Sequence, residues 1–158
     1  MKYKINTILT SLVFLLVFAG LAIAHFQEEE IDEVQQSESL ELHTIMRLLM
    51  LDMHTINEGI YTQNFELIES GALNINQHPA LAPESRQLVT ETLGERMEQF
   101  GAYDNVVHHI ADSLRQAAVD EDIERVMDHY RIIEQGCISC HASFQDEIKQ
   151  ARILKNQQ

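Results

Sequence analysis

The chain has 158 residues and a formal net charge of −14, from 25 Asp and Glu against 11 Lys and Arg. So acidic a chain argues against nucleic acid and anionic membranes as partners; the acid either suits a partner with a basic docking surface or keeps the protein soluble. Two prolines, six glycines and no long stretch of alternating apolar and polar residues predict an all-helical protein.

The N-terminal segment has the pattern of an export signal. Lys2 and Lys4 precede an apolar run over residues 8–24 that ends in Ala-Ile-Ala. This predicts a signal peptide over residues 1–24 and a periplasmic protein. Removing it leaves 134 residues, the size of one domain, with nine basic and 25 acidic side chains and a net charge of −16. Extended to residue 26, the run is nearly long enough to span a bilayer, so an uncleaved membrane anchor is the alternative.

Two helices are expected after an acidic lead-in over residues 25–37. The first covers residues 38–61, because its apolar residues recur at steps of four and three. The second covers residues 64–76 and ends at His78-Pro79, since a residue before proline is pushed out of the helical region. The inward-facing residues are predicted to be Leu42, Met46, Leu49, Met53, Ile56 and Ile60 in the first helix and Phe65, Ile68, Ala72 and Ile75 in the second.

Two longer helices follow. Pro83 and Glu84 suit the first turn of a helix over residues 83–118, although Gly94 and Gly101 weaken its continuity. The last helix begins at the acidic residues 120–122 and runs to Lys149. Their predicted inner stripes are Val89, Leu93, Met97, Phe100, Val107, Ile110 and Leu114, and then Ile123, Val126, Tyr130, Ile133, Cys137, His141, Phe144 and Ile148.

Four amphipathic helices with short connections predict an antiparallel four-helix bundle. The bundle domain covers residues 38–150, and residues 151–158 form a C-terminal tail.

Both cysteines lie in the run Cys137-Ile138-Ser139-Cys140-His141 on the last helix. CxxCH is the attachment signature of a c-type haem, in which two thiols bond to the haem vinyl groups and the adjoining imidazole ligates the iron. The rival interpretations are a redox disulfide, which normally follows an early strand, a zinc site, which needs further ligands, and a structural disulfide. The motif, the predicted export and the helix that carries it together favour one covalent haem c.

A C-terminal CxxCH on the last helix of an exported bundle resembles the class II cytochromes c, the family of cytochrome c′ and its low-spin relatives of the cytochrome c556 type. The resemblance covers residues 38–150 and includes Phe144, three residues after the histidine. Many members carry Arg or Lys after that aromatic residue, whereas this chain has Gln145. The resemblance also implies a homodimer through the first helix as an alternative to a monomer.

Met46 is the candidate for the distal side of the iron, opposite His141. In an up-down-up-down bundle, Met46 and His141 each lie eight residues from the same end, whereas Met53 is displaced by roughly 10 Å. The resemblance adds that low-spin members place a methionine ligand on the first helix and that high-spin members leave the iron open against an apolar wall. Met46 as ordinary core filling and His43 as the ligand are the other interpretations.

Two functions remain open, and neither is enzymatic. In the first, a periplasmic electron carrier exchanges single electrons with redox proteins, and its iron is held by His141 and Met46. In the second, His141 alone holds the iron and nitric oxide or carbon monoxide binds beside Met46. His54 with Glu58 and Asp104 with His108 have the i, i+4 spacing of metal ligands, but the glutamates of a di-iron bundle are missing.

Overall fold

The computed structural model describes residues 39–157, and every regular element in that range is helical. The expected signal peptide over residues 1–24 and the acidic lead-in over residues 25–37 lie outside the described residues. Within the described part, no helix is both long and apolar enough to cross a membrane.

Four long helices form the bundle: α2 (Leu42–Thr62), α3 (Phe65–Asn76), α5 (Met97–Val119) and α6 (Ile123–Lys155). The N-cap side chains of α3 and α6 explain where these two helices start. Asn64 accepts a hydrogen bond from the Leu67 amide at 3.2 Å, and Asp122 accepts one from the Arg125 amide at 3.1 Å. Each bond satisfies one amide that has no partner inside its own helix.

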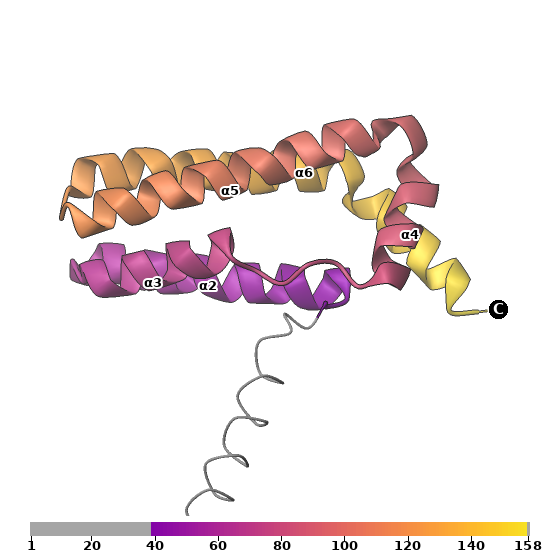
Figure 1. Cartoon of the computed structure of the whole chain (residues 1–158), viewed down its shortest axis with the longest axis horizontal. Helices are drawn as coiled ribbons and strands as arrows, with labels where there is room; N and C mark the ends of the chain where they lie inside the picture. The colour runs from indigo at the N-terminus through magenta and orange to yellow at the C-terminus, as the bar shows by residue number, and fades with distance from the viewer. Residues whose placement is uncertain (1–38, 158) are drawn as a thin grey trace, which may run out of the picture. The chain divides into compact units, whose positions relative to one another are not determined.

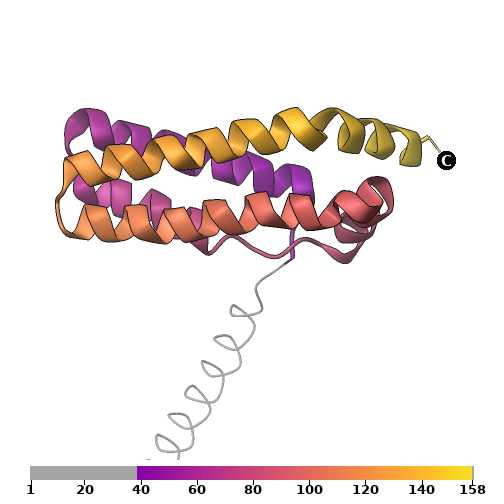
Figure 2. The ribbon, with the colours of Figure 1, turned by 90° about the horizontal axis from the view of Figure 1, so that it is seen from above.

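Within the described residues, the four helices are joined mainly by the packing of α2 on α3, of α3 on α5 and of α5 on α6. Figure 1 shows α2 beside α3 and α5 beside α6, and Figure 2 shows the same pairs from above. The two pairs are joined through close packing of α3 on α5. Close packing between α2 and α6 is absent among the described residues.

The expected helix over residues 83–118 is broken at Gly94. It forms α4 (Pro83–Leu93), a single 3₁₀ turn over Gly94–Arg96, and then α5. Gly94 has a φ of +52°, which a residue with a Cβ rarely adopts, so the helix ends there. Gly101, the other suspected break, lies inside α5. Because of the break, α4 turns across the end of the bundle and packs on α6 (Figure 1).

The last helix is longer than expected. It continues through Lys155 rather than ending at Lys149, so residues 151–155 are helical and do not form a tail. Arg152 and Lys155 lie in its final turn, where positive charge favours the carboxyl end of a helix.

The start of α2 is fixed by α4 and by the segment before it. Leu40 pairs with the segment ahead of α4, donating to the Ala80 carbonyl at 2.9 Å and accepting from the Ala82 amide at 2.8 Å. The hydroxyl of Ser85 accepts a hydrogen bond from the Leu42 amide at 3.1 Å and donates one to the Glu41 carboxylate at 2.6 Å. Ser85 therefore caps α2 from a different helix.

The apolar core has two parts. The larger cluster joins α2, α3, α5 and α6 and includes Ile56, Ile68, Leu114 and Ile133. The smaller cluster lies between α4 and α6 and consists of Val89, Leu93, Phe144 and Ile148.

Candidate cofactor site

The two cysteines lie between the two parts of the core. Both are on α6, three residues apart, and both are free thiols of intermediate exposure. Cys137 packs against the larger cluster, and Cys140 packs against the smaller one. The CxxCH run therefore lies at the junction between the two core clusters.

Burial keeps both thiols protonated near neutral pH. Loss of hydration raises the pKa of Cys137, with a further contribution from Glu134. It raises the pKa of Cys140 to about 11, and Cys137 and Asp104 add to the effect. A thiol with a raised pKa is a poor thiolate nucleophile, which weakens the redox-disulfide interpretation of this pair.

Apolar side chains of α2 and α5 pack against the same core clusters as the cysteines. Half-buried Leu49 and Met53 of α2 and Val107 of α5 pack on the same cluster as Cys137. The side chains packed on the same cluster as Cys140 are Leu42, Met97, Phe100 and Tyr103. The rings of Phe100 and Tyr103 both stand edge-on to Phe144, with centroids 5.7 and 6.1 Å away.

His141 lies at the edge of the inner stripe. It is exposed, whereas Phe144 and Ile148 of the same predicted stripe are buried. The expectation that His141 faces the core is therefore wrong for these side-chain positions. Its position is 80° around the helix from Ile133, since each residue turns the helix by about 100°. Tyr130 lies on the same edge. Burial raises the pKa of its phenol, and the charges of Glu134 and then Tyr61 of α2 add to the rise.

Met46 is also more exposed than expected. Its side chain is 36% exposed, and the buried position of this turn is Ile45, at 1%. The inner stripe of α2 therefore passes through Ile45 instead of Met46, whereas Leu42, Leu49, Met53 and Ile56 keep their inward positions. The heptad pattern alone did not reveal this, because Ile45 and Met46 are both apolar. His43 is exposed as well.

The arrangement suits attachment of a large apolar cofactor. It combines two thiols one turn apart, an imidazole next in the chain and half-buried apolar side chains of α2 and α5 on the same two clusters as the thiols. These residue types fit a c-type haem, whose porphyrin is apolar and whose vinyl groups react with thiols.

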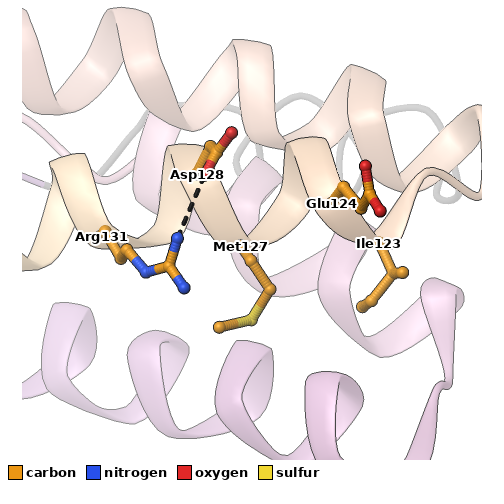
Figure 3. A pocket seen from close by; sticks show the side chains of 5 residues that line it. All are labelled: Ile123, Glu124, Met127, Asp128 and Arg131. Atoms are coloured by element: carbon orange, nitrogen blue, oxygen red, sulfur yellow. Dashed lines mark hydrogen bonds and ion pairs between the residues drawn. The ribbon is translucent and has the colours of Figure 1, made fainter.

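A surface hollow near the start of α6 is a separate feature. Figure 3 shows its lining, which is Ile123, Glu124, Met127, Asp128 and Arg131. Arg131 donates to Asp128 at 3.1 Å, so these two charges offset each other, and Glu124 is the third charged residue of the lining. All five residues belong to one face of one helix, about 15 Å along the axis from the cysteines, and the hollow is not part of the cofactor site.

Sequence reasoning missed a second group of candidate residues. His78, Asp104 and His108 place one ligand atom each within 4.8 Å of one another. The i, i+4 spacing of Asp104 and His108 was a visible signal, but the third residue comes from another part of the chain. Its partner could not be named without the packing of α3 on α5.

No model of a known protein family matches the chain, and no curated protein or solved structure is significantly similar to it.

Proposed function

We propose that this chain is a mono-haem c-type cytochrome that carries single electrons between redox proteins in the periplasm. Its fold is then an antiparallel four-helix bundle with a covalent haem on the last helix. The sequence predicts the haem near the C-terminal end of that helix, but because α6 continues to Lys155 the attachment residues lie near its middle. The observation that carries the proposal is the position of Cys137 and Cys140, half-buried on α6 at the junction of the two core clusters.

The roles of the chain's residues follow from their places. The Cys137 and Cys140 thiols form the two covalent bonds, and His141 supplies the proximal nitrogen. The apolar residues of α2 and α5 exclude water from the ring. When bound, the haem supplies a one-electron redox couple.

Cross-helix pairs support Met46 as the distal residue. Asp52 of α2 meets Asn74 of α3, Asn76 meets His108 of α5, and a Cβ on Gly136 of α6 would lie 3.1 Å from Val107. At about 1.5 Å per residue, these steps put Met46 level with residue 139 of α6, roughly 3 Å from the level of His141.

Met50 does not lie level with His141. The same steps put it roughly 9 Å from the level of His141, and its side chain is 52% exposed.

A thioether from Met46 would raise the reduction potential, which suits an electron carrier. The acidic surface of the chain favours a partner with a basic docking surface.

The first test is the absorption spectrum of the purified exported protein, ferric and ferrous, before and after carbon monoxide. We expect a low-spin spectrum with a weak red sulfur-to-iron band and no response to the gas. A high-spin spectrum that shifts with carbon monoxide would instead indicate the five-coordinate, gas-binding alternative. A protein without a haem spectrum would contradict both functions.

The second test compares Met46→Ala with Met50→Ala. Met46→Ala should convert the iron to high spin and open it to carbon monoxide, because the thioether is lost. Met50→Ala, a matched change one turn further along α2, should leave the spectrum unchanged. Equal spectra in the two variants would contradict Met46 ligation.

A further inference from the structure

His78, Asp104 and His108 come together from two parts of the chain. His78 follows α3, in the connection to α4, whereas Asp104 and His108 are one turn apart on α5. The His78 Nε2 atom lies 4.0 Å from one Asp104 oxygen, and the His108 Nε2 atom lies 3.8 Å from the other. The two imidazole centroids are 4.6 Å apart.

The backbone sets which nitrogen of each ring carries the proton. His78 Nδ1 lies 2.9 Å from the Pro79 carbonyl, and His108 Nδ1 lies 2.8 Å from the Asn76 carbonyl. A carbonyl oxygen only accepts, so each Nδ1 must donate. In the neutral rings, both Nε2 atoms then carry a lone pair, and both are the atoms nearest Asp104.

This is the arrangement found around protein metal ions. Histidine ligands usually donate their second ring N–H to a carbonyl or carboxylate, which fixes the tautomer and the ring orientation. Asn76 strengthens the support for His108, because its side-chain amide also donates to the His108 carbonyl at 3.1 Å. One ligand is therefore clamped to the end of α3 by two hydrogen bonds.

The spacing and exposure also suit a metal ion. Ligands on one tetrahedral ion, with bonds of about 2.0 to 2.1 Å, lie about 3.4 Å apart, so closing the observed gaps needs only small side-chain rotations. The His78 and His108 side chains are 16% and 27% exposed, whereas that of Asp104 is 55% exposed. An ion would enter past the carboxylate and keep a water on its open side.

We propose that His78, Asp104 and His108 bind a single divalent transition-metal ion, with Zn²⁺ as the fitting case. Two imidazoles and one carboxylate suit zinc and its neighbours better than Ca²⁺ or Mg²⁺, which prefer oxygen ligands. The site would link the connection after α3 to α5. It does not depend on the haem proposal.

A second carboxylate favours a cation here. Asp52 of α2 is partly buried, and loss of hydration raises its pKa, while Asn74 and then His78 oppose that rise. The His78 imidazole thus lies close enough to act on the Asp52 carboxylate. Asp104 likewise acts on Cys140, so the site lies near the cysteine pair without sharing a ligand with it.

The test is calorimetric titration of the full-length protein with ZnCl₂ after dialysis against EDTA, above the ordinary histidine pKa of about 6.5. We expect one saturable site. Asp104→Asn should lower the zinc affinity at least about tenfold, and His108→Ala should abolish zinc binding. His109→Ala, an exposed neighbour outside the cluster, should bind as the original chain does.

Asp104→Asn keeps the test decisive if His108→Ala fails to fold. Asp104 is largely exposed and forms only long ion pairs, so its amide should leave the fold intact, which circular dichroism would verify. Failure of the original chain to bind zinc, or equal binding by Asp104→Asn, would overturn the proposal. Binding lost in Cys137→Ser/Cys140→Ser but kept in Asp104→Asn would place zinc on the thiols and would also overturn it.

Discussion

Two glycines let α2 and α3 approach closely. A Cβ on Gly59 would lie 2.7 Å from the Ile68 side chain and 2.8 Å from the Asn64 carbonyl. A Cβ on Gly71 would lie 2.7 Å from the Ile56 side chain and 2.9 Å from the Asp52 carbonyl. Because each contact includes backbone, a side chain at either position would force the two helices apart.

We expect Gly59→Ala and Gly71→Ala each to lower the free energy of unfolding by about 1 to 3 kcal/mol, as overpacking of a core does. Gly101→Ala is the matched control. Gly101 is also in a helix, but a Cβ there would meet no atom within 4 Å. Alanine at this position should therefore raise the free energy of unfolding by about 0.5 to 1 kcal/mol through its higher helix propensity. Denaturant unfolding measures the stability of all three variants. Equal changes in the free energy of unfolding would contradict the close approach of α2 and α3.

Single residues also show where sequence reasoning ended. The CxxCH run could be recognised in the sequence because two cysteines and a histidine at fixed spacing define it. The exposure of Met46 was not, because Ile45 and Met46 fit the heptad pattern equally well. The grouping of His78 with Asp104 and His108 depends on how α3 packs on α5, which no local pattern reports.

At the scale of elements, α2 depends on α4 for its cap. Glu41, its own N-cap residue, makes no side-chain bond to the helix. Ser85 supplies the acceptor for the Leu42 amide instead, and it is 5% exposed. An amide left without a partner in such a place costs free energy, since water reaches it poorly.

We therefore expect Ser85→Ala to lower the free energy of unfolding by about 1 to 3 kcal/mol. Ser143→Ala is the control, because Ser143 is exposed and bonds only to a carbonyl within its own helix. Thermal unfolding of the two variants gives the comparison. A loss for Ser143→Ala as large as that for Ser85→Ala would show that the cap contributes nothing.

Most helix ends could be predicted from the sequence to within a few residues, because the apolar period, Pro83 and the acidic residues at helix starts are local signals. Two features were not. The direction of α4 follows from the positive φ of Gly94, and sequence showed only that a glycine was present. The continuation of α6 past Lys149 was missed because residues 150–155 are mostly exposed and add little to an inner stripe.

At the scale of the whole molecule, the net charge of −14 opposes the compact state. Several ion pairs in the described range are exposed at both partners, such as Arg125 with Asp120 at 2.9 Å and Arg131 with Asp128 at 3.1 Å. Such pairs contribute little and are screened by salt, as is the long-range repulsion.

We expect the repulsion to dominate, so that Tm rises by a few degrees when NaCl is raised from low to moderate concentration. The Debye length then falls below about 10 Å, which screens distant like charges. Scanning calorimetry at two salt concentrations measures the effect, with an equal osmolarity of a neutral solute as control. A falling Tm would mean that attractive pairs outweigh the net charge.

The Ser85 cap has a consequence for the order of folding. It joins residues 43 positions apart, whereas α2 with α3 and α5 with α6 are helix pairs joined by short turns. Contacts between near neighbours lose less chain entropy when they form, so the helix pairs should form first and the cap last. Loss of the cap should then appear mainly as faster unfolding, with refolding almost unchanged. The start of α2 would be the place where the native chain first opens.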